Sequence, residues 1–518
     1  MNVRPLVVAI AFLIPSGLEA EEPAKAAVAS NPTPGEVPAA VAPAVATPAA
    51  AAPAAAAEPF AWADFTWLNG NNRQKAALLD SKYFTGQFTA DVNWVYDFNH
   101  PIDHTIVGST ATFRANEFNL SFLGFGGDFH YDNVRGRLMT QFGTRATGIA
   151  RNDASADRGQ FDLRDALRYV SEAYGGYHWD ILNGINLDAG IFMSYVGLFS
   201  YSNFENWAYQ PSYTSDNTPW FFNGARLQVF PSDRTKLELW VVNGWQTYAG
   251  FNTAPGIGFQ YLYRPQEAIS IVANGYVGSD TTPINRAYDA ASRIRFHSDN
   301  SLQIRYFNNP GKFFHRAAVS LTADLGLESG AGVQPFGNGI FGTVGNGNAG
   351  RKDSSGNALA PTCGGALLGA PGTPDCTQNF MAAMLYHRMW FMNDLIGWTV
   401  GGGVMHNPGR YLVLPPTGAA NPYNAANANA FTLNAGDQFD AWDASTTVQI
   451  MPNEYVTWVI ELVHRHTFDN LNYFAGRGGV TSATGYYPSN VQSYGDPNYL
   501  PDLRNAETRI NLSMLVHF

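Results

Sequence analysis

Apolar residues occupy every second position near the end of the chain. The apolar positions, at a spacing of two, are Ile510, Leu512, Met514, Val516 and Phe518. The polar positions between them are Glu507, Arg509, Asn511, Ser513 and His517. Only a β-strand places alternate residues on opposite faces. The pattern predicts either the closing strand of a transmembrane β-barrel, apolar toward lipid and polar toward a wet lumen, or the last strand of a soluble sandwich. We treat Leu512, Met514, Val516 and Phe518 as a candidate assembly signal.

The same alternation recurs upstream and places charged residues opposite apolar ones. In Val134–Phe142, for example, Val134 and Leu138 share one face, while Arg135 and Arg137 share the other. These segments are about as long as the roughly 9–11 residues that a tilted strand needs to cross a bilayer. Aromatic residues also collect near the strand ends, which favours the barrel. The charged residues predicted to line its lumen are Arg135, Arg137, Arg293, Arg295, Arg305, Arg316, Glu461, Arg465 and Arg509.

Turn residues divide the chain into strands. The pairs Asp132-Asn133 and Asn393-Asp394 are hairpin signals, and Ser298-Asp299-Asn300 is counted as a third. Long polar connections alternate with these turns, as in barrels with short periplasmic turns and long extracellular loops. The inventory gives about 17 strands, although bacterial barrels have even numbers. We therefore predict an all-β, antiparallel transmembrane barrel of 16 or 18 strands, with the counting error between Gly278 and Gly326 or in the loop that follows.

The ends of the chain predict four regions. Residues 1–20 carry Arg4, an apolar stretch and a small residue, Ala20, as in a secretory signal peptide. Residues 21–58 are Ala/Pro-rich and predict a disordered periplasmic linker, either an unbound tether or a spacer toward the cell wall. Residues 59–86 form an aromatic segment followed by an expected short helix over 71–82, and residues 87–518 form the barrel. No other stretch reaches the roughly 18 apolar residues of a membrane helix.

The composition limits the kinds of partner that we expect. Charged residues make up 14% of the chain, against about 25% in soluble domains. The net charge is -11, and the basic residues are scattered, so nucleic acid is not an expected partner. We expect no cofactor and no metal.

Two small sets of residues are candidates for a disulfide or a metal site. Cys363 and Cys376 lie in a Gly/Pro-rich segment of an exported chain, which favours a disulfide, because two cysteines alone are too few ligands for a metal. His464 and His466 share one face of a strand and could bind a metal, but their phase favours rim residues near the lipid headgroups. No local pairing of a nucleophile with a base is found, so no catalytic residue is predicted.

A long loop between residues 151 and 168 mixes charges of both signs. Its constriction candidates are Arg151, Asp153, Asp157, Arg158, Asp162 and Arg164. Two interpretations stay open: a solvated external loop, or a loop folded into the lumen whose opposed charges select solutes.

Several stretches resemble one known family. They are LDSKYF, FNHPIDHTIVGST, GGDFHYDNVRGRLMTQFG, RNDAS, SEAYGGYH, GINLDAGIFMSYVGLFSY, NWAYQPSYTSDNTPWFFNG, NPGRYLVL and PDLRNAETRINLSMLVHF, in order from Leu79 to Phe518. Together they resemble the β-barrel porin-2, or OmpL-like, porins of Gram-negative bacteria. The resemblance implies an outer-membrane diffusion channel. The expected partners are outer-membrane lipid and lipopolysaccharide, the barrel-assembly machinery, and small solutes or ions. The alternatives are a barrel enzyme of lipase or protease type and an adhesive or structural barrel.

Overall fold

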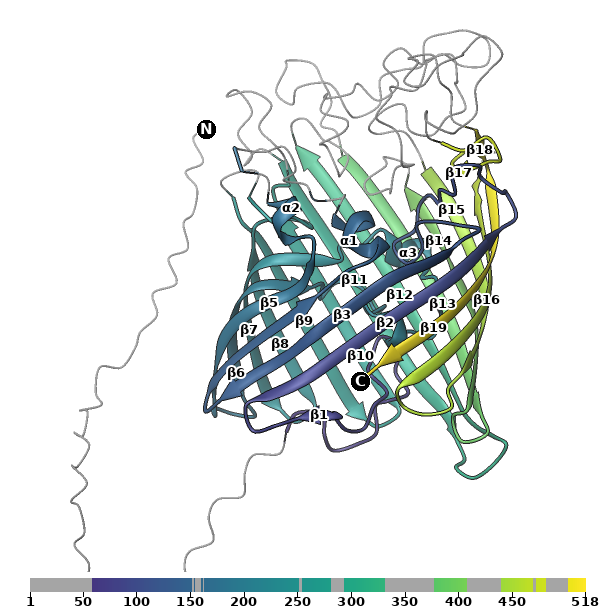
Figure 1. Ribbon diagram of the computed structural model, residues 1–518. Coiled ribbons are helices and arrows are strands. Elements are labelled where there is room, and N and C mark those ends of the chain that lie inside the picture. The colour runs from purple at the N-terminus through teal and green to yellow at the C-terminus, as the bar shows by residue number, and fades with distance from the viewer. Residues whose placement is uncertain are drawn as a thin grey trace, which may run out of the picture. The chain divides into compact units, whose positions relative to one another are not determined.

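Sixteen antiparallel strands close into a barrel in the computed structural model (Figure 1). The structure describes residues 58–150, 153, 160–161, 163–250, 254–280, 293–330, 377–407, 439–468, 472–480 and 502–518. The barrel strands are β2 (Phe84–Asp97), β3 (Phe118–Tyr131), β4 (Val134–Thr140), β5 (Val170–Trp179), β6 (Ile185–Met193), β7 (Phe221–Ser232), β8 (Thr235–Val242), β9 (Gly256–Gln266), β10 (Ile269–Gly278), β11 (Arg293–Asn308), β12 (Phe314–Gly330), β13 (Thr377–Phe391), β14 (Ile396–Asn407), β15 (Phe439–Ile450), β16 (Val456–Thr467) and β19 (Ala506–His517).

The last strand closes the barrel against the first. β19 pairs with β2 from Arg509 opposite Asp97 to His517 opposite Thr89. Phe518 extends this ladder, since its backbone N–H donates to the Phe88 carbonyl at 2.9 Å and its own carbonyl accepts from Phe88 at 2.5 Å. A two-residue strand, β1 (Leu79–Asp80), adds to β2, and β17 (Phe474–Ala475) pairs with β18 (Leu503–Arg504). The even count confirms the lower of the two predicted numbers.

The expected turn at Ser298-Asp299-Asn300 is wrong. These residues lie in the middle of β11, which pairs continuously with β10 on one side and β12 on the other. Asp299 points inward and is 1% exposed, whereas Asn300 points outward. By composition alone, three consecutive polar residues resemble a turn. Here their side chains alternate between the inner and outer faces of a continuous strand. Removing this turn removes the surplus strand from the count.

Short turns and long connections occupy opposite rims. The chain turns tightly at one rim between β3 and β4, between β13 and β14 and between β15 and β16, and Figure 1 shows β1 and the C-terminus at this rim. The long connections carry α1 (Thr144–Gly148), α2 (Arg164–Leu167), the 3-10 helix η2 (Asn203–Glu205) and α3 (Tyr213–Asp216). Among the described residues, no helix is both long and apolar enough to cross a membrane. The helix expected over 71–82 is absent from this described stretch, which is irregular apart from β1.

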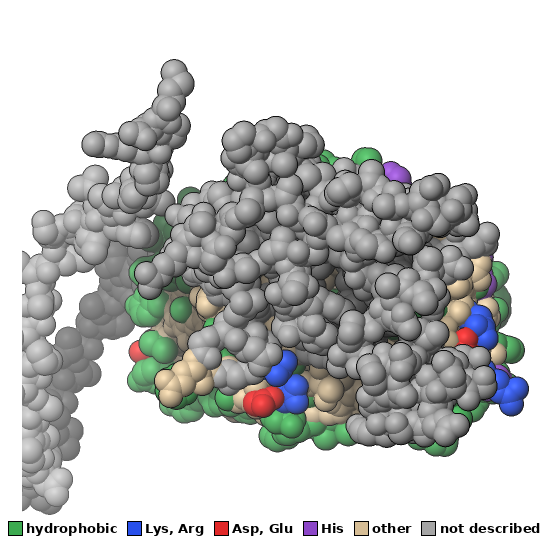
Figure 2. Space-filling view, turned by 90° about the horizontal axis from the view of Figure 1, so that it is seen from above, with side chains coloured by type: hydrophobic (Ala, Val, Ile, Leu, Met, Phe, Trp, Pro, Cys, Tyr) green, Lys and Arg blue, Asp and Glu red, His purple; other side chains and the backbone are tan. Residues whose placement is uncertain are grey.

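The two faces of the strands differ as the alternation predicts. On β8, Leu237, Leu239 and Val241 point outward and are 42–44% exposed, while Glu238 points inward and is 6% exposed. Viewed from above, hydrophobic side chains form the outer border of the barrel (Figure 2). The outward apolar band is therefore the lipid-facing surface.

The hydrophobic core lies inside the barrel rather than between two layers. One cluster surrounds Phe222, Trp240 and Tyr276, and a second includes Trp67 and Trp207. A water-filled porin lumen is expected to be polar, so these aromatic clusters show that part of the lumen is packed with side chains.

Candidate functional site

The connection between β6 and β7, residues 194–220, folds into the lumen. We call it the infolded loop. Nearly every residue from Phe199 to Trp220 is buried, including Tyr209 and Tyr213, which are no more than 1% exposed. Residues 203–216 of the loop pack on the inner face of β14, β15, β16, β19 and β2, which we call the covered wall. The first residues of the loop pack on β7 and β8, where the Tyr195 ring stacks on those of Phe222 and Trp240.

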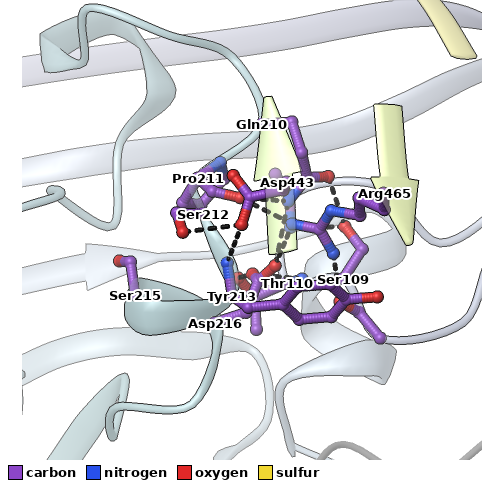
Figure 3. A network of polar contacts seen from close by, with 12 residues as sticks. Ser109, Thr110, Gln210, Pro211, Ser212, Tyr213, Ser215, Asp216, Asp443 and Arg465 are labelled. Carbon is purple, nitrogen blue, oxygen red and sulfur yellow. Dashed lines mark hydrogen bonds and ion pairs between the residues drawn. The ribbon is translucent and has the colours of Figure 1, made fainter. Parts of the chain in front are cut away.

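A buried ion pair forms the centre of this contact (Figure 3). The Arg465 guanidinium on β16 donates to the Asp216 carboxylate at 2.5 Å and to the Pro211 carbonyl at 2.6 Å. The same guanidinium lies 4.4 Å from the centre of the Tyr213 ring. Arg465 and Asp216 are fully buried. A buried charge pair of this kind is costly to break, because either partner left alone is an uncompensated charge.

Two further carboxylates of the covered wall hold the backbone of the infolded loop. Asp443 accepts hydrogen bonds from the Ser212 hydroxyl at 2.7 Å and from the Tyr213 N–H at 2.9 Å. Glu461 accepts from the N–H groups of Tyr209 at 2.7 Å and Gln210 at 2.9 Å. Carboxylates that bind backbone N–H groups fix the path of the loop as well as its position.

The connection between β2 and β3 joins the same network. The Gly108 carbonyl accepts a hydrogen bond from Arg465, and both the N–H and the hydroxyl of Thr110 donate to Asp216. Ser109 donates to the Gln210 side chain at 2.7 Å. This second connection therefore braces the infolded loop from its other side.

Burial raises the pKa of two carboxyl groups in the infolded loop. Burial raises the pKa of the Asp216 carboxyl, although Arg465 and the hydrogen bonds from Thr110 act to lower it. Glu205, in η2, is half-buried, and desolvation raises the pKa of its carboxyl to about 7, with the hydrogen bond from Ser200 opposing the shift. Glu205 can therefore change charge near neutral pH.

The opposite side of the lumen differs. We call the inner face of β3 to β8 the open wall. Its charged side chains form ion pairs with one another instead of with the infolded loop: Arg137 with Glu172 (2.5 Å) and Asp128 (2.7 Å), Arg135 with Asp188 (3.2 Å), Arg226 with Asp188 (2.7 Å) and Lys236 with Glu238 (2.7 Å). The side chains of Arg135 and Lys236 keep 31% and 18% exposure, whereas Asp188 and Glu238 keep 2% or less. Apart from Asp128 and Glu172, the accessible charge on this wall is basic.

The N-terminal segment, residues 58–78, crosses the periplasmic end of the barrel. Its Phe60 N–H donates to the Asp233 carbonyl in the β7–β8 turn. Farther along, Arg73 donates to the Asn453 carbonyl in the β15–β16 turn at 2.8 Å. Between them, Gly70 approaches the infolded loop so closely that a Cβ would lie 2.0 Å from the Leu198 carbonyl oxygen. The segment thus supports the infolded loop from the periplasmic side.

Most of the charged residues predicted to line the pore point inward but are covered. Arg295, Arg305, Glu461, Arg465 and Arg509 are at most 5% exposed. Arg135, Arg137 and Arg316 keep partial exposure, at 31%, 15% and 13% of their side chains. The side chain of Arg293 lies outside the described residues. The alternation thus gives the direction of a side chain but not what packs against it, and pore lining itself stays a prediction.

The loop singled out by its charges is only partly described. Asp153 is buried and accepts a hydrogen bond from the Tyr248 N–H at 3.1 Å, and Arg164 begins α2. The remaining candidates Arg151, Asp157, Arg158 and Asp162, and the cysteines Cys363 and Cys376, lie outside the described residues. On β16, His464 faces outward beside Trp442 and donates to or accepts from the Thr508 hydroxyl at 2.8 Å.

Sequence reasoning classed Ser200–Thr218 as an ordinary long connection and missed its place in the lumen. One signal was available. This stretch is rich in Trp and Tyr and carries only two charged residues, Glu205 and Asp216. A solvated external loop has little use for several large aromatic side chains, because each gains free energy by burial.

A lipid-facing barrel of sixteen strands, narrowed by a connection folded into its lumen, defines the chain as an outer-membrane porin. The family comparison agrees. A family model described as "Putative beta-barrel porin-2, OmpL-like" matches residues 83–487, and the chain belongs to this family. No curated relative matches the chain in sequence.

Comparison with solved structures finds outer-membrane proteins at low sequence identity and at TM-scores of 0.40–0.42. The trimer form of OmpT of Vibrio cholerae is 8% identical, with a TM-score of 0.42, over 85% of this chain and 100% of that one. The outer-membrane channel DcaP of Acinetobacter baumannii is 11% identical, with a TM-score of 0.40, over 87% and 100%. An anion-selective porin from Comamonas acidovorans is 8% identical, with a TM-score of 0.41, over 84% and 99%.

Proposed function

We propose that small hydrophilic solutes and ions cross this porin passively along the open wall, past the edge of the infolded loop. The observation that carries the proposal is the contrast in exposure between the two walls. Arg135 keeps 31% of its side chain exposed, whereas Arg465 and Arg509 keep none. Water and ions need accessible polar groups, and among the described residues the open wall offers more of them.

Around Arg135 and Lys236 the accessible charges of the open wall favour anions, whereas Asp128 and Glu172 lie beside Arg137. Asp188 and Glu238 lie beneath the basic side chains that pair with them, so Arg135 and Lys236 present their charge to the lumen. Arg226 is held in place by aromatic rings, with its guanidinium 4.7 Å from the centre of Phe192 and 5.1 Å from that of Tyr174. A fixed basic surface at a narrow point attracts anions even when the whole chain is acidic.

Two further proposals concern the role of the barrel and its molecular partners. We propose a transport role rather than a catalytic or adhesive one, because the buried carboxylates of the lumen serve to hold the infolded loop. We also propose lipopolysaccharide as a neighbour of the lipid-facing surface and the barrel-assembly machinery as a partner of the last strand. Loss of Phe518 should lower the amount of folded barrel in the outer membrane, and unchanged levels would reject that role.

The test of passive conduction is a planar lipid bilayer containing the purified, folded full chain. We expect stepwise current increases in potassium chloride and a reversal potential of anion-selective sign under a salt gradient. Folded protein that inserts but gives no current steps would reject the proposal and favour the adhesive or enzymatic alternative.

A further inference from the structure

A cavity of about 220 Å³ opens at the periplasmic end of the barrel. The N-terminal segment, the infolded loop and the turns after β13 and β15 enclose it. The lining residues that matter here are Arg73, Trp207, Arg316, Arg388, Trp390 and Met451. The cavity therefore has a basic side and an apolar side.

Arg388, on β13, is a buried cation without an anionic partner among the described residues. It is 3% exposed. Its guanidinium donates to the Trp207 carbonyl and the Thr399 hydroxyl, both at 3.2 Å, and to the Met451 sulfur at 3.6 Å. It forms no ion pair with any described residue, and its Nε has no hydrogen-bond partner. A charge held away from water without a counter-charge is unfavourable, so an anion bound beside Arg388 would be stabilised.

Neighbouring side chains add positive charge to the same place. The guanidinium groups of Arg316 and Arg388 lie 5.6 Å and 5.1 Å from the centre of the same Trp390 ring. Among the described residues, Arg73 donates hydrogen bonds to neutral groups only, at 2.8 Å to the Asn453 carbonyl and at 2.9 Å to the Val456 carbonyl and the Thr457 hydroxyl. Like charges gathered in this way repel one another unless an anion lies between them.

The acids that line the cavity are already engaged. Asp394 lies 2.9 Å from His315 and 3.6 Å from Arg316. Glu454 accepts a hydrogen bond from the Lys75 N–H at 3.1 Å. Glu205 accepts a hydrogen bond from Ser200. None of the three forms an ion pair with Arg388.

We propose that this cavity binds a small organic carboxylate, with the carboxylate on Arg388 and the apolar part against Trp207, Trp390 and Met451. A guanidinium suits a carboxylate, because its planar N–H groups can form parallel hydrogen bonds with the two oxygens, and Arg388 lines the cavity. A cavity of about 150 Å³ accommodates benzene, so the present volume leaves room for a ring bearing a carboxylate. The proposal rests on the porin function, since the cavity would hold such a solute at the periplasmic mouth.

A glycine on the neighbouring strand leaves room for the Arg388 side chain. Gly397 on β14, whose register partner is Trp390, has no side chain, and a Cβ there would lie 2.1 Å from Arg388 Nη2. Glycine at this position therefore leaves the space that the guanidinium occupies.

The test is calorimetric titration of the folded full chain in detergent with benzoate, with benzyl alcohol as the neutral analogue and with inorganic phosphate. We expect benzoate to bind at least tenfold more tightly than either of the others. Arg388→Met should weaken benzoate binding at least tenfold, whereas the matched loss of a lumen cation in Lys236→Met should change it less than twofold. Equal binding of benzyl alcohol, preferential binding of phosphate, or an unchanged affinity in Arg388→Met would overturn the site.

The same ligands separate this proposal from the porin function, because calorimetry needs no current. Benzoate binding by folded protein that never conducts would leave the site standing as a binding site and reject passive conduction. Conduction by protein in which benzoate and benzyl alcohol bind alike would reject the site and leave the porin.

Discussion

The two walls of the lumen carry the same kinds of residue and use them differently. On the covered wall, Asp443, Glu461 and Arg465 are at most 5% exposed and bind the infolded loop. On the open wall, Arg135 pairs with an acid of β6 and Arg137 with one of β5, and both stay partly exposed. The alternation of a strand is identical in both cases. The difference arises from which connection packs on the inner face, so a charged residue in a barrel lumen can serve as a structural clamp or as part of the conducting path.

The largest expected effect comes from breaking the clamp. Asp216→Ala leaves Arg465 buried without its partner, which costs roughly 3–5 kcal/mol. We expect the infolded loop to leave the covered wall and the single-channel conductance to rise severalfold. Limited proteolysis should then cut within residues 199–217.

The matched control lies one residue away. Ser215 is buried in the same helix, but its hydroxyl has no hydrogen-bond partner. Ser215→Ala should therefore leave conductance and proteolysis unchanged. If both variants behave like the wild type, the ion pair does not hold the loop.

A smaller effect should follow from crowding the loop without removing a charge. A Cβ added at Gly403, on β14, would lie 2.2 Å from the Ser212 hydroxyl. Overpacking of this kind costs roughly 1–3 kcal/mol. Gly403→Val should increase current noise and raise the mean conductance less than Asp216→Ala. Gly175→Val is the control, because a Cβ at Gly175 meets no atom within 4 Å.

On the open wall, charge removal should change selectivity and leave the loop in place. The double variant Arg135→Gln, Arg137→Gln removes two accessible positive charges, so the reversal potential in a salt gradient should shift toward cations. The matched control is Lys312→Gln, in the exposed β11–β12 turn. An equal shift in the control would mean that the lumen charges do not set selectivity.

The smallest expected effect is a dependence on pH through Glu205. Because desolvation raises the pKa of its carboxyl from 4.5 to about 7, the folded protein holds this proton more tightly than the unfolded chain does. Glu205 therefore costs no stability below about pH 4.5. The cost grows as pH rises toward 7 and is complete above it. We expect loop fluctuations, seen as current noise, to increase from pH 5 to pH 8, and Glu205→Gln to remove this dependence. A Glu205→Gln variant with the same pH profile as the wild type would assign the dependence to another group.

The fold follows from the sequence further than the site does. The alternation at Ile510–Phe518, broken only by Leu515, predicts a strand with a lipid face and a lumen face, because the period of two is a property of the backbone itself. The polar triplet Ser298–Asn300 misled the strand count, since local composition favours a turn while pairing on both sides keeps the strand intact. Element type is local information, and the number of strands depends on long-range pairing.

The site could not be predicted in the same way. Strand phase correctly places Arg465 and Arg509 toward the lumen, but their cover comes from residues more than two hundred positions away in the chain, at Gln210 and Asp216. A mixture of charges of both signs is the sequence feature that predicts a constriction loop, and it favours residues 151–168. The connection that the structure shows inside the lumen is marked by aromatic residues and few charges, because it must be buried.

The most direct test of the two-wall account is the reaction of introduced cysteines with a water-soluble methanethiosulfonate reagent during current recording, with Cys363 and Cys376 replaced by serine. Arg135→Cys reports on the open wall, and Ser513→Cys, nearly isosteric and 6% exposed in the wild type, reports on the covered wall. The account predicts a rapid, stepwise loss of current in Arg135→Cys and no reaction in Ser513→Cys. Rapid modification of Ser513→Cys, with Arg135→Cys unaffected, would contradict it.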